Sequence, residues 1–194
     1  MKQTTDKKSL IELLHDLIVD DLHLDTTKGV IHITEKQEQA TCKCVDFKLK
    51  QSIPCFCFTI DKQREKDKGD PIFPFFNPEI SGICSKNDAI LICQKRQKIY
   101  IFLIELKSKN KNNYLKQLKS AQIFIRFILE RIELYDLCKD NLKNLEFREI
   151  LFSCKRTPNE GITKHQKVEF IDKKGLLVTY QECNKSYNLN AFLY

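Results

Sequence analysis

Two apolar runs separated by a basic turn form the clearest pattern in the chain. The first is AILIC at 89–93, and the second, IYIFLIEL at 99–106, is apolar at both phases of the two-residue period. A run rich in β-branched and aromatic residues, without Pro or Gly, is typical of a strand buried on both faces. With residues 94–98 as the connection, the two runs predict an antiparallel hairpin.

Charged residues stand at one end of this predicted hairpin. Asp88 precedes the first run, and Glu105 and Lys107 close the second. Because side chains alternate along a strand, Glu105 and Lys107 share one face while Leu106 points to the other. Antiparallel pairing brings Asp88 beside them. We therefore expect two carboxylates and an ammonium group at one edge of the sheet.

Such a trio suits the hydrolysis of phosphodiester bonds. Two carboxylates can hold a hard divalent cation, Mg²⁺ or Mn²⁺, to which the backbone carbonyl of Leu106 would add a ligand. The cation would activate a water and neutralise phosphoryl oxygens, while the lysine would orient that water or stabilise the transition state. The predicted catalytic residues are Asp88, Glu105 and Lys107, and the predicted metal ligands are Asp88, Glu105 and Leu106.

These residues resemble the signature of the PD-(D/E)XK nuclease superfamily: an acid at the start of one strand, Glu-x-Lys on the next, then a helix. The resemblance covers roughly residues 82–135, with Asn87 where the superfamily name has proline. It implies a restriction-endonuclease-like core, and it implies that Gln117 in the following helix supports the site. Many members also carry an acid on an N-terminal helix, for which both Glu12 and Glu79 remain open.

The rest of the chain predicts further elements around the hairpin. Ser9 and Glu12 form a capping box at the start of a helix that we expect to reach Asp21. Residues 114–135 repeat apolar positions every three or four residues, as an amphipathic helix does. Alternating or apolar runs predict strands, at 30–34, 40–49, 53–61, 147–154, 168–171 and 176–180, of which the first three form a meander beside the hairpin.

These elements predict one α/β domain over residues 1–194. Its mixed central β-sheet is flanked by the two helices, and strands are added at both ends of the core. A long loop at about 61–82 has a highly charged half, DKQREKDKGD, and a Pro/Phe-rich half, PIFPFFNPEISG. Long ordered loops of this kind tend to be functional or mobile, so a lid or strand guide is expected there.

Composition places the chain among globular intracellular proteins. It is 42% apolar and 30% charged, without an apolar tract that could span a bilayer and without a signal-peptide pattern. We therefore expect a cytoplasmic protein with no membrane association. The net charge of +7 favours a polyanionic partner, because phosphate neutralisation dominates affinity for nucleic acids.

Nine cysteines raise the question of disulfides or zinc. Cys42 and Cys44, like Cys55 and Cys57, form Cys-x-Cys pairs in strand-like stretches, and Cys-x-x-Cys spacing is absent from the sequence. Residues two apart on a strand share a face, so these pairs are expected to pack inward as reduced thiols. Zinc stays open as the alternative if four thiols meet across neighbouring strands.

Taken together, the sequence predicts a magnesium-dependent endonuclease acting on nucleic acid, with DNA favoured over RNA. The resemblance implies a restriction, repair or antiphage defence role, with a homodimer or a partner protein assisting. The alternative is a catalytically inactive nucleic-acid-binding or assembly module on the same fold. A third reading is a structural or partner-regulating protein, in which Asp88 and Glu105 lie too far apart to share a cation.

Overall fold

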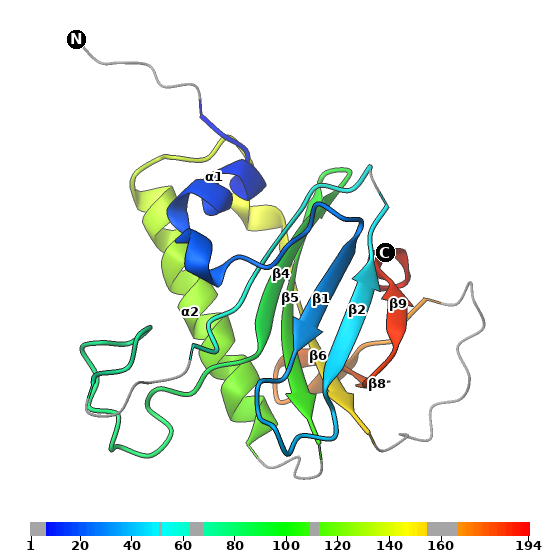
Figure 1. Cartoon of the computed structure of the whole chain (residues 1–194). Coiled ribbons are helices and arrows are strands. Elements are labelled where there is room, and N and C mark those ends of the chain that lie inside the picture. Colours follow the sequence, from blue (N-terminus) through cyan, green and yellow to red (C-terminus); the bar gives the residue numbers. More distant parts are fainter. Residues whose placement is uncertain (1–6, 51, 63–67, 109–112, 155–166) are drawn as a thin grey trace.

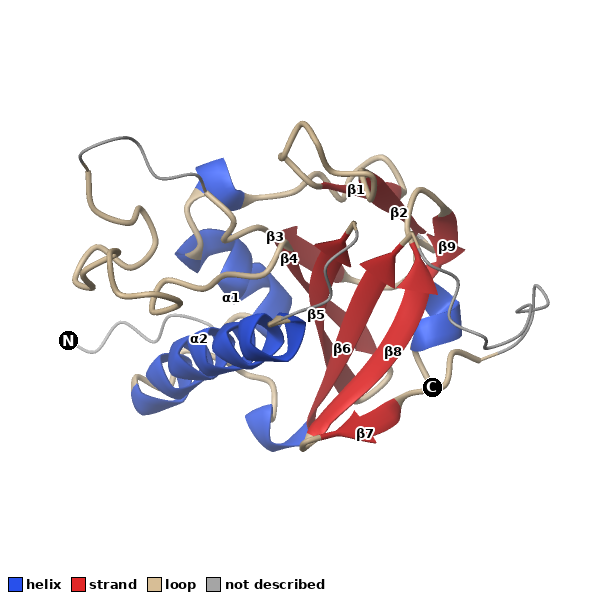
Figure 2. Cartoon of the chain, turned by 90° about the horizontal axis from the view of Figure 1, so that it is seen from below, coloured by secondary structure: helices blue, strands red, loops and turns tan. Residues whose placement is uncertain are grey.

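The protein is built in three layers around a six-stranded sheet. The computed structural model describes residues 7–50, 52–62, 68–108, 113–154 and 167–194. Two helices lie on one face of the large sheet, and a three-stranded sheet lies on the other (Figures 1 and 2). The predicted mixture of helices with a mixed sheet is confirmed.

The large sheet has the strand order β3-β4-β5-β6-β8-β7. Antiparallel pairs join β3 to β4 and β4 to β5, parallel pairs join β5 to β6 and β6 to β8, and β7 is antiparallel to β8. The strands are β3 (Cys55–Phe58), β4 (Ala89–Lys95), β5 (Lys98–Lys107), β6 (Leu145–Ser153), β7 (Ile171–Lys173) and β8 (Leu176–Glu182).

The small sheet has the order β1-β2-β9, with β1 antiparallel and β9 parallel to β2. Its strands are β1 (Val30–Thr34), β2 (Cys44–Lys48) and β9 (Ser186–Asn188). The α-helices are α1 (Leu10–Leu17) and α2 (Tyr114–Leu134), and short 3-10 helices cover Asp20–Leu22, Leu142–Asn144 and Leu189–Phe192.

The predicted hairpin is confirmed as β4 and β5. Its connection is tighter than expected, because the strands reach Lys95 and Lys98 and leave only Arg96 and Gln97 between them. Arg96 has a φ of 58°, in the left-handed region that two-residue hairpin turns use. Every residue of β5 from Ile99 to Leu106 is buried, which agrees with its apolar character at both phases.

Helix α1 begins as the sequence predicts and ends earlier. The Ser9 side chain accepts from the Glu12 amide and the Glu12 side chain accepts from the Ser9 amide, which completes the capping box. The helix stops at Leu17 because Ile18 and Val19 are extended. Both are β-branched, a class that loses side-chain freedom in a helix. The segment up to Asp21 continues as a 3-10 turn instead.

Helix α2 matches its predicted range to within a residue. It buries the stripe expected from its spacing, comprising Leu118, Ala121, Ile125, Leu129 and Ile132. The opposite side carries charged residues, including Lys116, Arg126 and Glu130. Among the helices in the described ranges, none combines the length and apolar character needed to cross a membrane.

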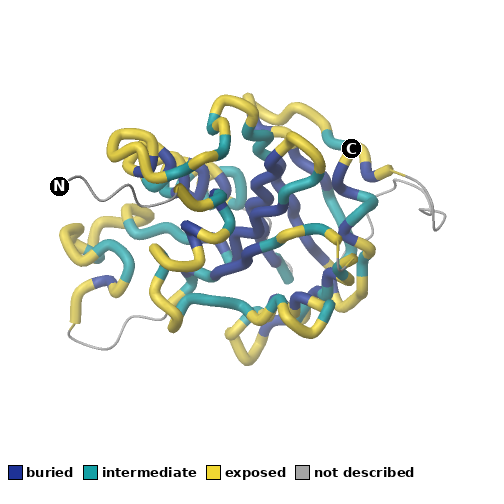
Figure 3. The backbone as a smooth tube through the Cα atoms, turned by 90° about the horizontal axis from the view of Figure 1, so that it is seen from above, coloured by how far each residue is buried: buried dark blue, intermediate teal, exposed yellow. Residues whose placement is uncertain are grey.

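The two faces of β5 bury two separate core clusters. Ile101 and Leu103 pack with the leucines of α1 and α2, whereas Phe102 and Ile104 pack with Phe47 and other residues of the small-sheet layer. Figure 3 shows the buried residues concentrated along the central strands. Both helices therefore cover the same face of the sheet.

The predicted meander is wrong for its first two strands. Only β3 joins the hairpin, while β1 and β2 form the separate small sheet with β9. The reason lies in their burial pattern, since both strands bury alternate residues and leave the others exposed or partly exposed. Such strands suit an outer layer that covers an apolar sheet on one side. The three residues of β9, which are mostly polar and exposed, gave no strand pattern to recognise.

We expect Phe47→Ala to lower the free energy of unfolding by about 3–5 kcal/mol, because its fully buried ring packs between the two sheets against Phe152 and Phe192. The matched control is Phe75→Ala, whose ring is 75% exposed and whose loss should change stability by less than about 0.5 kcal/mol. Urea unfolding of both variants measures the difference. Equal effects would contradict a core layer built on the small sheet.

Candidate active site

The start of β4 and the end of β5 bring Asp88 and Glu105 together. The β4–β5 register pairs Ala89 with Ile104, so the next residues along, Asp88 and Glu105, lie opposite each other on the helix-covered face. The Asp88 amide donates to the Ile104 carbonyl at 3.1 Å. The Leu106 amide donates to Asp88 Oδ2 at 2.5 Å. The Asp88 carboxylate is thus fixed to the backbone of β5.

Lys107 forms an ion pair with Glu105 on the same face. Its Nζ lies 2.6 Å from Glu105 Oε1, and the exposed fraction of the glutamate side chain is only 3%. The second oxygen, Oε2, is buried and has no hydrogen-bond partner among the described residues. Buried polar atoms are nearly always paired, so this oxygen is an acceptor still available to a ligand.

Two further carboxylates reach the same place from other strands. Glu35 follows β1 directly, and Asp61 lies three residues beyond the end of β3. One oxygen from each of Glu35, Asp61 and Asp88 lies within 4.8 Å of the other two. The charges of Glu35 and Asp61 also act on Glu105. We call Glu35, Asp61, Asp88 and Glu105 the carboxylate cluster.

Burial and crowding of like charges raise the pKa of both central acids. The pKa of Asp88 is well above its usual range because the group is buried and because the Glu105 charge lies next to it. Burial raises the pKa of Glu105 to about 7, although Lys107 opposes the shift. Asp88 and Glu105 therefore keep their protons to a higher pH than exposed acids do. A divalent cation would supply a counter-charge and allow the acids to ionise.

Helix α2 holds the segment that carries Asp88. Gln117 Nε2 donates to the Lys86 carbonyl at 3.2 Å, and Ser120 Oγ donates to the Ser85 carbonyl at 2.8 Å. Gln117 thus positions the chain just before Asp88, as the resemblance implies for a supporting residue, and it does so through the backbone.

Asn87 and Lys86 tie the same segment to the core. The buried Asn87 side chain donates to the Ala89 carbonyl at 2.6 Å and to the Ile104 carbonyl at 3.2 Å. Lys86 Nζ lies 2.8 Å from Asp70 Oδ2 in a pair whose side chains are 11% and 5% exposed. Breaking a buried pair of this kind leaves an uncompensated charge, so it anchors the long loop before β4.

The long loop is attached to α2 through its aromatic half. The Phe73 ring packs edge-on against Phe124 of α2, with 5.8 Å between centroids, whereas Phe75 projects into solvent. Residues 63–67 of the charged half lie outside the described residues. The predicted use of this loop as a lid or strand guide stays a prediction.

The two acids considered from sequence as a third carboxylate lie elsewhere. Glu12 is engaged in the capping box of α1, and Glu79 is exposed in the loop before β4. Neither belongs to the carboxylate cluster, whose additional members are Glu35 and Asp61. A signal for both exists in the sequence, since each acid stands at the end of a strand-like stretch, as Glu105 does.

The predicted ligand Leu106 takes part through a different atom. Its amide holds Asp88, and its side chain is buried on the opposite face from Glu105. A role for its carbonyl oxygen as a metal ligand stays a prediction.

Comparison of the chain with protein-family models, curated proteins and solved structures gave no match.

The raised pKa of Glu105 makes the stability of the metal-free protein depend on pH. Folded Glu105 keeps its proton up to about pH 7, whereas the unfolded residue loses it near pH 4.5. Between these values the folded state binds more protons, so the free energy of unfolding falls as pH rises. Glutamine does not titrate, so Glu105→Gln should not lose stability in this way. Between pH 4.5 and about pH 7 its free energy of unfolding should rise relative to that of wild type by on the order of 3 kcal/mol.

Urea unfolding in EDTA at several pH values measures this difference. The control is Glu130→Gln, which removes an exposed carboxylate on α2 and should leave the wild-type pH dependence in place. A constant stability difference between Glu105→Gln and wild type at every pH would show that Glu105 titrates as it does in the unfolded chain.

Proposed function

We propose that this protein is a metal-dependent nuclease of the PD-(D/E)XK type, with a restriction-endonuclease-like core. The observation that carries the proposal is the buried Glu105, which pairs one oxygen with Lys107 and leaves the other without a partner among the described residues. Asp88, Glu35 and Asp61 converge on it. A buried acid, an ammonium group and three more acids at one sheet edge are the parts that phosphodiester hydrolysis with a divalent cation requires.

The order of elements agrees with the resemblance seen in the sequence. Asp88 stands at the start of β4, Glu105 and Lys107 stand at the end of β5, and α2 follows. Helix α2 then leads to β6, which pairs with β5 in parallel. The same helix supplies Gln117 behind the Asp88 segment.

The donor set fits a hard cation such as Mg²⁺ or Mn²⁺. Carboxylate oxygens are the ligands these ions prefer, and Glu105 Oε2 is a buried oxygen that lacks any other described partner. When bound, the cation would acidify a water and neutralise charge on the phosphoryl oxygens.

Lys107 and Lys36 supply the positive charges of the proposed mechanism. Lys107 Nζ, held by Glu105, would donate to the attacking water or to the phosphoryl oxygens as negative charge develops. Lys36 Nζ donates to the Asp61 carbonyl at 2.7 Å, which places a second ammonium group at the rim of the cluster. There it would contact the phosphate on one side of the scissile bond.

The substrate proposed is DNA, with RNA as the second choice. The net charge of +7 favours either polyanion, and the superfamily resemblance favours DNA together with a role in restriction, repair or antiphage defence. The same resemblance favours a homodimer or a partner protein that delivers the substrate. The inactive binding or assembly module on the same fold remains the alternative.

Lys107→Met and Asp88→Asn should each lower Mg²⁺-dependent cleavage of DNA by about 100-fold or more, because each removes a charge that acts in the transition state. Their affinity for the same DNA, measured without divalent cations, should stay within a few-fold of wild type. The matched control is Lys116→Met, which removes an exposed lysine on α2. Cleavage is followed on single-stranded, duplex and branched DNA and on RNA.

Two outcomes separate the proposed nuclease from its alternatives. Wild-type protein that binds nucleic acid but cuts none of these substrates with Mg²⁺ or Mn²⁺ would establish the binding module. Protein that neither binds nor cuts would favour the structural or partner-regulating protein.

Glu35→Gln and Asp61→Asn test whether the additional acids hold the cation. Each should weaken Mn²⁺ binding by at least about tenfold, the lower end of what loss of a supporting metal contact costs. Titration calorimetry measures this affinity without any substrate. Glu38→Gln, an exposed acid in the same loop as Glu35, serves as the control. Unchanged affinity in both test variants would confine the metal site to Asp88 and Glu105.

A further inference from the structure

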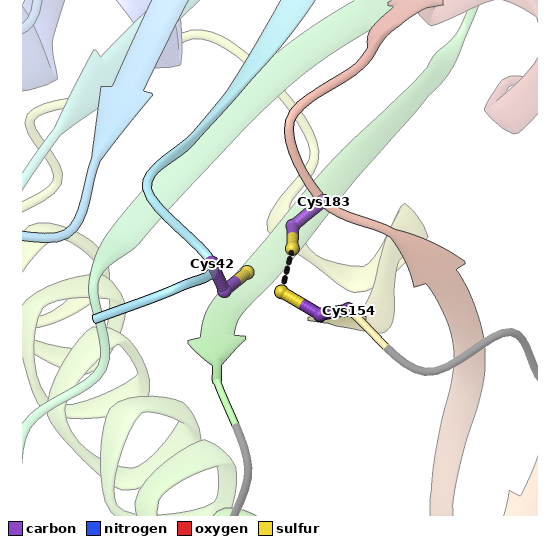
Figure 4. Close-up of side chains that lie close together, drawn as sticks. All are labelled: Cys42, Cys154 and Cys183. Carbon is purple, nitrogen blue, oxygen red and sulfur yellow. Dashed lines mark hydrogen bonds between the residues drawn. The ribbon is translucent and has the colours of Figure 1, made fainter. Parts of the chain in front are cut away.

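Three thiols meet on the opposite face of the sheet from the carboxylate cluster. One sulfur from each of Cys42, Cys154 and Cys183 lies within 4.8 Å of the other two, and those of Cys154 and Cys183 are 3.0 Å apart (Figure 4). We call these residues the thiol cluster. All three are free cysteines that come from segments far apart in the sequence.

Each thiol stands at the end of an element. Cys42 precedes β2, Cys154 follows β6 and Cys183 follows β8. Cys42 and Cys183 are buried in the core between the two sheets, while Cys154 is exposed. The cluster therefore joins the small sheet to the ends of β6 and β8 in the large sheet, with Cys154 as its exposed member.

The backbone around the thiol cluster is fixed by a network of hydrogen bonds. Ser108 Oγ accepts from the amides of Thr41 and Cys42 at 2.7 and 3.0 Å. Asn184 Oδ1 accepts from the amides of Lys43 and Cys44, and its Nδ2 donates to the Thr41 carbonyl at 2.9 Å. Ser108, the residue after β5, thus holds the Cys42 backbone, and Asn184, the residue after Cys183, holds the chain on both sides of Cys42.

We propose that the thiol cluster binds one zinc ion through the sulfurs of Cys42, Cys154 and Cys183. Zinc–sulfur bonds of about 2.3 Å in a tetrahedron place the sulfurs about 3.8 Å apart, a separation that small side-chain shifts reach from the distances present. A water would complete the coordination beside Cys154, the exposed member of the thiol cluster.

Zinc accounts for the cluster better than a disulfide does. A disulfide would join two of the sulfurs at about 2.05 Å and leave the third unused. Cys55 and Cys93 form another close pair, with sulfurs 3.2 Å apart. Among the described residues this pair belongs to no group of three possible metal ligands, whereas Cys42, Cys154 and Cys183 form such a group. Burial and the neighbouring thiols of Cys183 and Cys154 raise the pKa of the Cys42 thiol, and the Lys107 backbone amide only partly opposes this shift. A bound zinc ion would supply the positive charge that lets the thiol ionise.

The proposed zinc site is chemically separate from the proposed nuclease site. Its ligands are soft sulfurs, whereas the carboxylate cluster offers hard oxygens suited to Mg²⁺. The expected role of zinc is structural: it would hold the start of β2 in the small sheet against the ends of β6 and β8 in the large sheet. Loss of zinc would weaken this attachment. The proposal stands whether or not the protein cleaves nucleic acid.

Cobalt(II) titration of the reduced protein in excess Mg²⁺ tests the site. Wild-type protein should bind about one Co²⁺ with thiolate-to-cobalt charge-transfer absorption, which carboxylates do not produce, and one equivalent of Zn²⁺ should abolish it. Cys154→Ser should weaken Zn²⁺ binding at least tenfold, and because the residue is exposed the variant should fold. Cys183→Ser should behave alike, whereas Cys55→Ser should bind as wild type does.

Either of two results would overturn the proposal. One is reduced wild-type protein that shows no charge-transfer band and takes up no zinc. The other is Cys154→Ser and Cys183→Ser proteins that bind zinc as tightly as wild type. A Cys154–Cys183 disulfide found by mass spectrometry, in protein that fails to bind zinc after reduction, would assign the pair to redox chemistry instead. Circular dichroism of each variant controls for folding.

Discussion

The structure depends on the antiparallel register of β4 and β5, which sets two acids side by side at the edge of a buried sheet. One face of β5 packs on helices and the other on the small sheet, so the strand must be apolar until it leaves the core. Glu105 is the point at which this apolar character ends, yet it is still buried. An acid in such a place needs a partner, and Lys107 satisfies only one of its oxygens.

Crowding of like charges is normally destabilising, and here four carboxylates share one edge. Chance surface acids would spread apart into solvent, because exposed charges gain little from proximity. The Asp88 carboxylate is instead held by the Leu106 amide, and its segment is held by Asn87 and Gln117. Holding like charges together costs stability in the absence of a cation. Acids with shifted pKa values gather at functional sites, so this crowding is one of the grounds for the nuclease proposed above.

What the sequence predicted correctly was local. The capping box, the hairpin and the stripe of α2 each depend on residues within one or two elements, and the acid-and-lysine edge follows from the hairpin alone. Glu35 and Asp61 also stand at the ends of strand-like stretches, but their approach to Glu105 depends on how β1 is layered and how β3 is paired, which no local pattern encodes. The alternation of apolar and polar residues in β1 and β2 is the same for a strand that extends the large sheet and for one that covers it.

The end of β5 connects the two proposed metal sites. Glu105 and Lys107 point to the helix-covered face, while on the other face the Lys107 amide approaches Cys42 and Ser108 Oγ holds the Cys42 backbone. A cation on either face would therefore restrain the same three residues, 106 to 108. Because the ligands on one face are oxygens and those on the other are sulfurs, each site selects a different metal from the same solution. The two cations would then act on one strand end without competing, one in chemistry and the other in holding the small sheet in place.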